Sequence, residues 1–316
     1  TGGSGFFGSC LAALLTSLGH ECLWVDHNLS LKAHTQKFPQ ALKVSPQALL
    51  ENHRYWEQAT AVFHLGACSS TTETNWEYLQ NNNVEYSKNI WNRCGEYHLP
   101  LVYASSAATY GDGEQGYSDR HEDLEKLMPL NLYGKSKQLF DLWAIKERVK
   151  TPSRWYGLKF FNVYGPNEYH KQEMRSLAHK AFEQIQSSGT VRLFKSHKTG
   201  YADGKQLRDF IYVKDVVKAM LEFLQAAQAE SGIYNLGTGV ANSFYDLVKQ
   251  TFISMGKEEK IEFIDMPAAI RGQYQYFTQA DMAKFRHQFP AFIFSQLRPA
   301  VADYVENYLL SADPFY

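Results

Sequence analysis

Tyr133 and Lys137 are the two residues whose types and spacing most clearly suggest chemistry. On a helix, residues four apart lie on one face, so the ammonium of Lys137 would stand beside the hydroxyl of Tyr133. A tyrosine ionises near pH ~10, and a neighbouring cation favours its anionic form. Such a phenolate can remove the proton of a sugar alcohol. An isolated Tyr-x-x-x-Lys match is more often an exposed helix surface, so the surrounding motifs decide its meaning.

A glycine-rich segment adds a candidate nucleotide site. The pattern Gly2-x-x-Gly5-x-x-Gly8 opens an expected helix, whose amide groups and dipole can bind a pyrophosphate. Asp26 ends the next expected strand, where a carboxylate can bind a ribose hydroxyl of adenosine. Together these residues predict dinucleotide binding. The choice between NAD and NADP stays open: Asp26 would repel a 2′-phosphate, whereas the following polar and basic residues could offset this, namely Asn28, Lys32 and Lys37.

Ser106 lies in the segment 104–111, at the end of another expected strand. Open α/β sheets bind ligands at the carboxyl ends of their strands, so its hydroxyl could donate a hydrogen bond to a substrate oxygen. Its alternative role is local, as a turn hydroxyl that bonds the nearby backbone.

These residues need a scaffold, and residues 1–166 predict one. Short apolar runs alternate there with helical stretches, which indicates βαβ units and a parallel sheet. The expected strands are 22–25, 61–65, 101–105 and 155–160, and the expected helices are 8–18, 75–97 and 133–149. Right-handed connections would give a doubly wound α/β (Rossmann) sheet that forms a dinucleotide-binding domain.

The rest of the chain follows a different pattern. Residues 167–316 are expected to form mainly a smaller α/β substrate-binding lobe, with a helix at 173–187, a polar loop at 195–206 and a strand at 210–213. A segment near 207–240 is expected to return to the first domain. The chain opens on Thr1-Gly2-Gly3 without the buried strand that normally precedes a glycine loop, so we expect the first strand to be missing through trimming.

The composition is that of a soluble globular protein with a sizeable core: 316 residues, 44% hydrophobic and 21% charged. Its 32 basic and 33 acidic residues cancel, which argues against nucleic-acid or acidic-membrane partners. The four cysteines are scattered without metal-ligand spacing, which predicts a reducing compartment and no metal site. No apolar run reaches the length of a membrane span and the start is not a signal peptide, so we expect a cytoplasmic protein without a membrane anchor.

In their order, the glycine loop, Asp26, Ser106, Tyr133 and Lys137 resemble the extended short-chain dehydrogenase/reductase family of nucleotide-sugar enzymes. The resemblance covers nearly the whole chain, since it continues through residues 161–166, 208–216 and 234–239. It implies that Lys137 orients a nicotinamide ribose and lowers the pKa of Tyr133, and that Ser106 helps to bind the reacting hydroxyl. It also implies one tightly bound NADP or NAD per subunit.

Details of the sequence indicate a subgroup. Ala107 and Ala108 stand where the 4,6-dehydratases carry an acidic pair, so loss of water from the sugar is disfavoured. Four stretches resemble instead the ADP-glycero-manno-heptose 6-epimerases: 64–73, 105–111, 162–171 and 272–279. These enzymes invert C6 of an ADP-activated heptose by transient oxidation to a ketone and hydride return to the opposite face, for lipopolysaccharide core precursors. The resemblance implies this substrate and a homo-oligomer, such as a pentamer.

The same resemblance implies a second acid–base residue, Lys171. Reaction at both faces of one carbonyl needs proton transfer from opposite sides, and in the heptose enzymes a tyrosine and a lysine each serve one orientation. The matching residues are Tyr133 and Lys171. A lysine titrates near pH ~10.4 in water, so burial or nearby positive charge must lower its pKa for this role. Without the resemblance, an exposed loop cation is an equally good interpretation.

Other positions carry over singly from the resemblance. The residues implied to bind the cofactor are Gly2, Gly5, Phe6, Phe7, Gly8, Asp26, His27, Lys37, Leu65, Gly66, Ala67, Cys68, Ser69, Asn82, Tyr133, Lys137, Val163 and Lys171. Those implied to bind the substrate are Ser106, Asn162, Glu173, Lys180, Phe194, Lys195, Arg208 and Tyr274. Arg208 would suit the diphosphate through its planar guanidinium.

Three departures bear on the identity of the sugar. Glu173 replaces a small hydroxyl residue, Gln273 replaces an arginine, and the loop 196–206 is longer than expected. Two other functions therefore stay open. One is a 4-epimerase or reductase of another nucleotide sugar that uses the same triad without Lys171. The other is a cofactor-sensing protein that performs no chemistry.

Overall fold

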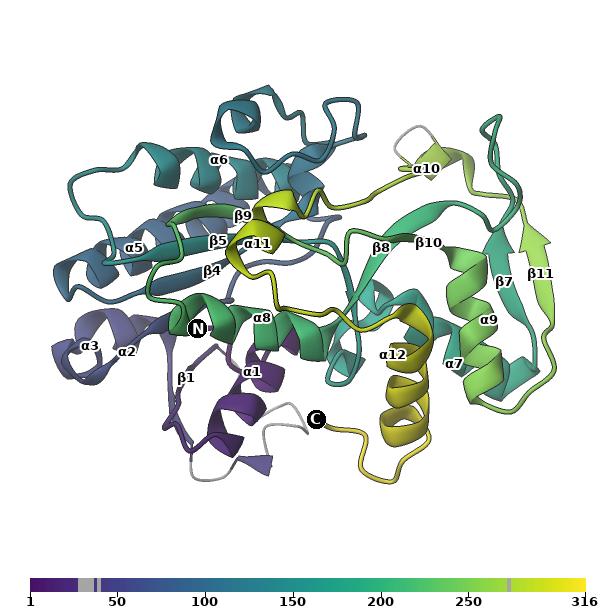
Figure 1. Ribbon diagram of the computed structural model, residues 1–316, viewed down its shortest axis with the longest axis horizontal. Helices are drawn as coiled ribbons and strands as arrows, with labels where there is room; N and C mark the ends of the chain where they lie inside the picture. The colour runs from purple at the N-terminus through teal and green to yellow at the C-terminus, as the bar shows by residue number, and fades with distance from the viewer. Residues whose placement is uncertain (28–36, 39–40, 272–273) are drawn as a thin grey trace.

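A computed structural model describes residues 1–27, 37–38, 41–271 and 274–316 (Figure 1). Its main sheet has four parallel strands in the order β3 (Val62–His64), β4 (Leu101–Ser106), β5 (Trp155–Phe160) and β9 (Gly232–Leu236). A second parallel pair joins β1 (Leu23–Val25) to β2 (Leu42–Val44). The predicted parallel α/β sheet is confirmed, and the predicted strand 155–160 has the observed bounds.

Thr1 and Gly2 connect these two sheets. The nitrogen of Thr1 donates to the Phe63 carbonyl in β3 (2.6 Å), and the Thr1 carbonyl accepts from Leu65 (3.1 Å). On the other side, the amide of Gly2 donates to the Val25 carbonyl at the end of β1 (2.7 Å). Thr1 and Gly2 thus bridge the end of β1 and strand β3 directly before the glycine loop.

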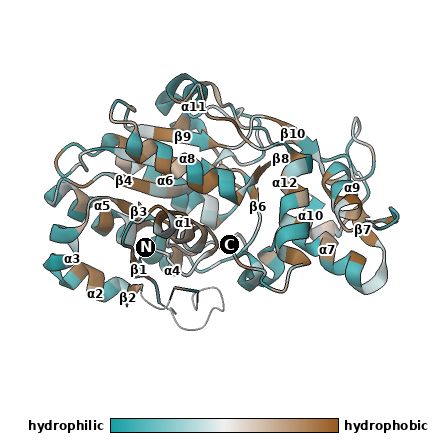
Figure 2. Ribbon diagram, turned by 60° about the horizontal axis from the view of Figure 1, so that its bottom comes forward, coloured by the Kyte–Doolittle hydropathy of each residue, from teal (hydrophilic) through white to brown (hydrophobic). Residues whose placement is uncertain are grey.

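Helices cover both faces of the main sheet, as a doubly wound fold requires. Figure 1 shows α5 (Tyr86–Glu96) and α6 (Leu132–Lys146) on one face, and α1 (Phe6–Ser17) and α8 (Val213–Gln225) on the other. Their apolar residues recur at helical spacing. In α8 the buried apolar side chains are Val213, Val216, Val217, Ala219, Met220 and Phe223. Figure 2 shows hydrophobic residues concentrated in the central strands and hydrophilic residues on outer helices such as α3 (His53–Gln58).

The helix expected at 75–97 is divided. It consists of α4 (Trp76–Leu79), a π-helical stretch (Gln80–Glu85) and α5. Trp91 of α5 packs between the sheet and α6, with ring centroids 5.1 Å from Trp155 and 6.3 Å from Phe140. This half also contains α2 (Pro46–Glu51) and two 3₁₀ segments (Ala107–Tyr110 and His121–Lys126).

The second lobe is built around two small sheets. In one, β8 (Leu207–Tyr212) pairs parallel with β6 (Asn162–Tyr164) and antiparallel with β10 (Ala241–Ser243). In the other, β7 (Val191–Phe194) and β11 (Ile261–Ile264) are parallel, beside α7 (Leu177–Ser188) and α9 (Phe244–Ser254). The remaining elements are α10 (Ala268–Arg271), α11 (Ala283–Gln288), α12 (Leu297–Tyr304) and a π-helical stretch (Val305–Leu309).

The expected elements of the lobe shift in position. The helix predicted at 173–187 begins only at Leu177, because Ser176 caps it and a 3₁₀ segment (Tyr169–Met174) precedes it. Inside that segment Gln172 has a left-handed φ of 48°. The strand predicted at 210–213 spans Leu207–Tyr212.

The chain passes between the two parts repeatedly. After β5, a single residue, Phe161, separates the main sheet from β6 of the lobe. Strand β8 of the lobe leads directly into α8, and β9 then enters the main sheet before β10 leaves it. Among the described residues, no helix combines the length and apolar character needed to cross a membrane.

Candidate active site

A cavity of about 1000 Å³ lies where the carboxyl ends of the main strands meet the second lobe. The residues just beyond four strands line it: Asp26 after β1, Leu65 after β3, Ser106 at the end of β4 and Phe161 after β5. At the far end it is lined by Leu193 and Phe194 of β7 and by residues of α7. This is the edge at which an open parallel sheet is expected to bind its ligands.

The glycine loop forms one end of the cavity. Gly2 has a left-handed φ of 73°, and a Cβ on Gly8 would lie 2.1 Å from the Gly2 carbonyl oxygen. Gly5 precedes α1 without a capping side chain, and no acidic residue stands in the first turn of that helix. A tight backbone turn in front of an uncapped helix N-terminus fits the pyrophosphate of a dinucleotide.

Asp26 stands beside this loop at the end of β1. Its carboxylate accepts hydrogen bonds from the backbone amide (3.1 Å) and the hydroxyl (2.6 Å) of Ser4. Of the described residues that line the cavity, Asp26 alone carries a carboxylate. It is therefore placed to accept a hydroxyl of the adenosine ribose.

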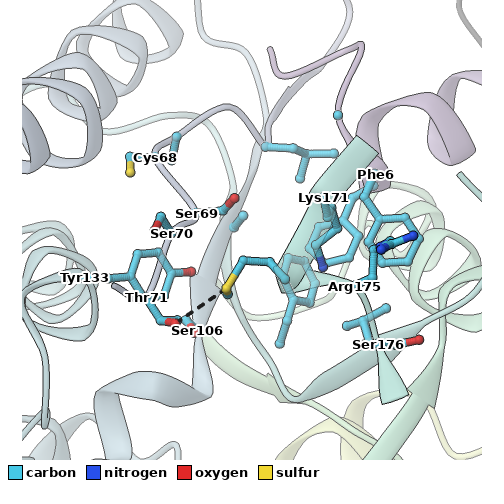
Figure 3. A pocket seen from close by; sticks show the side chains of 18 of the residues that line it. Phe6, Cys68, Ser69, Ser70, Thr71, Ser106, Tyr133, Lys171, Arg175 and Ser176 are labelled. Carbon is cyan, nitrogen blue, oxygen red and sulfur yellow. Dashed lines mark hydrogen bonds between the residues drawn. The ribbon is translucent and has the colours of Figure 1, made fainter. Parts of the chain in front are cut away.

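The N-terminus of α6 brings Tyr133 close to Ser106. The Asn131 side chain caps this helix by accepting from the amide of Gly134 (2.8 Å). A Cβ on Gly134 would lie 2.7 Å from the carbonyl oxygen of Ala108, so the helix start rests directly on the 3₁₀ segment after β4. Figure 3 shows the hydroxyl of Tyr133 facing Ser106 and Thr71. Ser106 also bonds locally, since its hydroxyl accepts from the amide of Ala108 (3.1 Å).

Lys137 lies one turn further along α6. Its ammonium donates to the Ala104 carbonyl (2.9 Å) and lies 6.0 Å from the centre of the Tyr133 ring. Burial lowers the pKa of Lys137 to about 8, and the negative charge of Asp141 opposes that change. Tyr133, Lys137 and Asp141 are spaced four apart and so lie on one face of the helix.

Asp141 belongs to a buried polar network under the cavity. Its carboxylate pairs with Lys159 of β5 (2.7 Å) and accepts from the hydroxyls of Ser105 (2.6 Å) and Tyr103 (3.1 Å). Lys159 is fully buried and also donates to the hydroxyl of Thr109 (2.7 Å). This network joins α6 to β4 and β5 directly behind Lys137 and Ser106.

The expected effect of Lys137 on Tyr133 is not what the structure shows. Burial raises the pKa of Tyr133 above its ordinary value, and a hydrogen bond with Ser106 opposes that rise. Burial is the largest cause of this shift, and the ammonium of Lys137 is bound to the Ala104 carbonyl. Burial at this position therefore favours the neutral phenol of Tyr133, which can donate a proton.

Lys171 approaches the cavity from the opposite side. It lies in the 3₁₀ segment before α7, with its ammonium 4.9 Å from the centre of the Phe6 ring. Figure 3 shows Lys171 and Tyr133 on opposite sides of the cavity. Burial lowers the pKa of Lys171, and the charge of Glu168 opposes this. Two groups that can exchange protons thus face one space from two sides.

The second lobe supplies cations and aromatic rings. Phe194 and Tyr274 face each other edge-on with ring centroids 6.4 Å apart, and both line the cavity. Cationic side chains from this part of the wall are Lys171, Arg175, Lys180 and Arg192. Rings can stack on a planar base and cations can bind a diphosphate, so this end suits a nucleotide-activated sugar.

Most of the predicted site residues line the cavity. Four described ones do not. Lys37 pairs with Asp313 (2.6 Å), and Lys195 lies 3.6 Å from Asp265. Glu173 points to solvent, with a side chain that is 93% exposed. Arg208 is buried between the rings of Phe244 and Tyr274 and donates to the carbonyls of Leu207 and Gln275, so it lies behind the wall. Asn28, Lys32, Gly272 and Gln273 lie outside the described residues.

The sequence interpretation missed two polar contacts at the wall. Arg175 lines the cavity, pairs with Glu183 (2.5 Å) and donates to the Gln172 carbonyl (2.7 Å). Thr71 of the segment after β3 donates to the sulfur of Met174 (3.9 Å), the contact drawn as a dashed line in Figure 3. Thr71 lies within the stretch 64–73 that carries the family resemblance, whereas for Arg175 the only available signal was its nearness in sequence to Lys171.

Comparisons with known proteins agree with this geometry. Residues 1–237 match the NAD dependent epimerase/dehydratase family. The chain is 45% identical over 325 residues to the ADP-L-glycero-D-manno-heptose-6-epimerase of Nitratidesulfovibrio vulgaris, with 100% of this chain and 98% of the relative covered. The enzyme of the same name from Fusobacterium nucleatum is 43% identical over 335 residues, with the same coverage.

A solved structure resembles the fold along almost its whole length. The crystal structure of Helicobacter pylori ADP-L-glycero-D-manno-heptose-6-epimerase superimposes with a TM-score of 0.80 and 25% identity, covering 97% of this chain and 94% of that one. The glycine loop, the strand-end serine and the helical Tyr–Lys pair thus occur in a chain whose sequence and fold match one family throughout. The chain belongs to the NAD-dependent epimerase/dehydratase family.

Proposed function

We propose that the protein interconverts the two C6 epimers of ADP-glycero-manno-heptose, a step in the synthesis of lipopolysaccharide core precursors. One observation carries the proposal: Tyr133 and Lys171 face the same cavity from opposite sides. A carbonyl that must be reduced on either face needs a proton donor for each of its orientations. The similarity to two heptose 6-epimerases along the whole chain supports this substrate.

The residues of the glycine-loop end fit a dinucleotide. Gly2, Gly5, Gly8 and the N-terminus of α1 would hold the pyrophosphate, and Asp26 the adenosine ribose. Lys137, which lies between Tyr133 and the strand ends, would bind the nicotinamide ribose. A bound oxidised nicotinamide would accept the C6 hydride and later return it to the other face of the carbonyl, and its positive charge would favour the phenolate of Tyr133.

Protons balance in this scheme. Oxidation moves the hydroxyl proton of the substrate to whichever of Tyr133 and Lys171 faces that oxygen. The exocyclic carbonyl group then turns, and on reduction the other residue gives its proton to the oxygen. One residue starts protonated and the other unprotonated, and their states exchange over each turnover. The lowered pKa of Lys171 suits this exchange, because the residue must be neutral in one of the two states.

The substrate nucleotide would occupy the lobe end. Phe194 and Tyr274 offer aromatic faces for adenine, and Lys180 and Arg192 offer positive charge for the diphosphate. Arg208 would act behind them by holding Tyr274, whose ring centre lies 5.4 Å from its guanidinium carbon.

The experiment is incubation of the purified protein with ADP-D-glycero-D-manno-heptose, followed by chromatographic separation of the epimers. We expect the wild type to produce a mixture, and Tyr133→Phe and Lys171→Met each to lower the rate by about 10²–10⁴-fold. Lys249→Met, which changes an exposed lysine of α9, is the matched control and should retain full rate. Absence of any interconversion by the wild type with cofactor present would refute the proposal.

The alternatives give different results when the same variants are assayed with a panel of nucleotide sugars. A 4-epimerase or reductase of another nucleotide sugar would keep its activity in Lys171→Met, because that reaction needs a single acid–base residue. A cofactor-sensing protein would bind NAD or NADP and turn over no nucleotide sugar. The buried network that supports Lys137 and Ser106 favours an enzyme over the second alternative.

Three further properties complete the proposal. We propose one tightly held NADP or NAD per subunit; Asp26 favours NAD, and titration of the cofactor-free protein with both decides between them. We propose a homo-oligomer such as a pentamer, which light scattering would measure. We propose a cytoplasmic location, which suits four cysteines that are all free thiols.

A further inference from the structure

Glu168 is a completely buried carboxylate with no role in the reaction described above. It stands at the start of loop 168–176, which leads from β6 to α7 and carries Lys171, Met174 and Arg175. A buried charge of this kind is costly unless hydrogen bonds satisfy it. Its bonding partners therefore indicate what it does.

Two of the four hydrogen bonds to Glu168 come from Ser176, at the far end of its own loop. Its carboxylate accepts from the backbone amide of Ser176 (2.5 Å) and from the hydroxyl of Ser176 (2.7 Å). The amide of Gly165 (3.3 Å) and the hydroxyl of Tyr304 in α12 (3.0 Å) complete the set. One side chain thus ties the two ends of the loop together and anchors them to the lobe.

The loop between these ends has few backbone hydrogen bonds of its own and is held mainly by side chains. Its backbone includes the left-handed Gln172, and its few backbone bonds include those from Lys171 to Glu168 (3.0 Å) and from Arg175 to Gln172 (3.1 Å). Side-chain contacts hold the rest of the loop: Tyr169 donates to the Pro314 carbonyl (2.5 Å), Lys180 donates to the Glu173 carbonyl (2.6 Å), Thr71 contacts Met174 across the cavity, and Arg175 pairs with Glu183 of α7. Without the link at its ends, the position of Lys171 would rest on these single side-chain contacts and on its packing against Phe6.

We propose that Glu168 is a positioning residue that closes loop 168–176 and thereby fixes Lys171 opposite Tyr133. The inference rests on the proposed function only for the role of Lys171. The closure of the loop itself follows from the four hydrogen bonds. Glu168 also influences Lys171 through its charge, which raises the pKa of that lysine against the effect of burial. The other charged or titratable groups on the loop or packed against it are Tyr169, His170, Glu173, Arg175, His179, Lys180, Glu183, Tyr304 and Cys10.

The test compares Glu168→Gln with Tyr304→Phe. In the first variant the new amide nitrogen is a hydrogen-bond donor and faces groups that are themselves donors, so part of the link between the loop ends is lost. The second variant removes only the hydrogen bond to α12 and leaves the loop ends joined. Hydrogen–deuterium exchange of peptides covering 169–176 should rise about tenfold or more in E168Q and stay at the wild-type level in Y304F. This measurement needs no substrate and decides the closure even if the proposed substrate is wrong.

Turnover gives the second measurement. In E168Q, kcat should fall about 10- to 100-fold while KM and cofactor affinity change less than about threefold, because only the acid–base residue is displaced. The limb of the pH profile that belongs to Lys171 should move to lower pH, since the charge that raises its pKa is lost. A purely structural role would not move that limb.

Wild-type exchange and kcat in E168Q would overturn the proposal. Should E168Q fail to fold, Ser176→Ala replaces it, because this variant removes the hydroxyl that donates to Glu168 and also caps α7. Hydrogen–deuterium exchange over 169–176 should again be faster than in Y304F. An exchange rate equal to that of the wild type would count against closure of the loop by Glu168.

Discussion

The protonation state of Lys137 links the buried network to the reaction. Its pKa is lowered to about 8, so it loses its charge as the pH rises through that value. We expect kcat/KM to decline with rising pH along a limb with its midpoint near pH 8, because a neutral Lys137 binds the ribose less strongly. A rate profile between pH 6 and 10 measures this. A profile that stays flat to pH 10 would contradict it.

Asp141 should set the position of that limb. Its charge raises the pKa of Lys137, so removing the charge in Asp141→Asn lowers this pKa and moves the alkaline limb to lower pH. In this variant the positive charge of Lys159 is no longer balanced by Asp141, and it lowers the pKa of Lys137 further. The measurement is the same pH profile, and the control is Asp123→Asn, which changes an aspartate of the 3₁₀ segment His121–Lys126 that pairs with Arg120 and Lys126. A limb at the wild-type pH in D141N would show that the network does not act on Lys137.

At the scale of single residues, spacing alone found the Tyr133–Lys137 pair, because a helix fixes what lies four residues away. Lys171 has no such local signal and was found only through the family resemblance. The direction of the Tyr133 pKa shift could not be read from sequence, because burial depends on elements far apart in the chain. The positions of Arg175 and Glu168 at the site could not be predicted for the same reason.

Among the elements, the glycine loop offers the sharpest prediction. In Gly8→Ala the new Cβ would lie 2.1 Å from the Gly2 carbonyl oxygen, and backbone cannot move aside as a side-chain end can. Overpacking of this kind costs about 1–3 kcal/mol, which would lower cofactor affinity by about tenfold or more. Gly3→Ala is the control, since its Cβ would meet side-chain atoms of Trp24 at 3.2 Å. Fluorescence titration with NAD and NADP measures both, and equal affinities would contradict the clash.

The link between α6 and β5 makes a prediction about stability. Lys159→Met leaves the Asp141 carboxylate buried beside Ser105 and Tyr103 without its cation, which costs about 3–5 kcal/mol. The double variant Asp141→Leu/Lys159→Met removes both charges and should recover most of that loss. Urea unfolding of the three proteins measures the difference. A double variant no more stable than the single one would show that the ion pair is not the cause.

The elements of the first half were largely predictable, whereas those of the lobe were not. Strands such as β5, which is fully buried and apolar except for Lys159, stand out between helices, and the first half repeats that pattern. The short strands β7, β10 and β11 and the helices α9, α11 and α12 were not identified, because they are brief or lie among polar residues. The break in the expected helix 75–97 arises from the π-helical stretch Gln80–Glu85, whose Asn83 bonds the Cys68 backbone and the Ser136 hydroxyl, contacts that no local pattern reveals.

At the scale of the whole molecule, one cavity joins the two parts, so a bound ligand should stabilise both. Cofactor at 100 times its dissociation constant adds about 2.7 kcal/mol to the free energy of unfolding when it binds only the folded protein. Thermal unfolding of cofactor-free protein with added NAD or NADP measures the shift, and Gly8→Ala should show little of it at the same concentration. A melting temperature unchanged by either nucleotide would contradict a dinucleotide site.

The repeated crossing of the chain between its two parts has a consequence for motion. At Phe161, at the β8–α8 junction and between β9 and β10, the backbone runs from one part to the other within a few residues. Three such connections resist a wide swing of one half against the other, since a hinge must bend all of them together. Entry and exit of the sugar nucleotide would then depend on small segments at the rim, above all on the separation of Met174 from Thr71. Rearrangements of this size occur in nanoseconds to microseconds, so we expect opening of the site to be faster than hydride transfer.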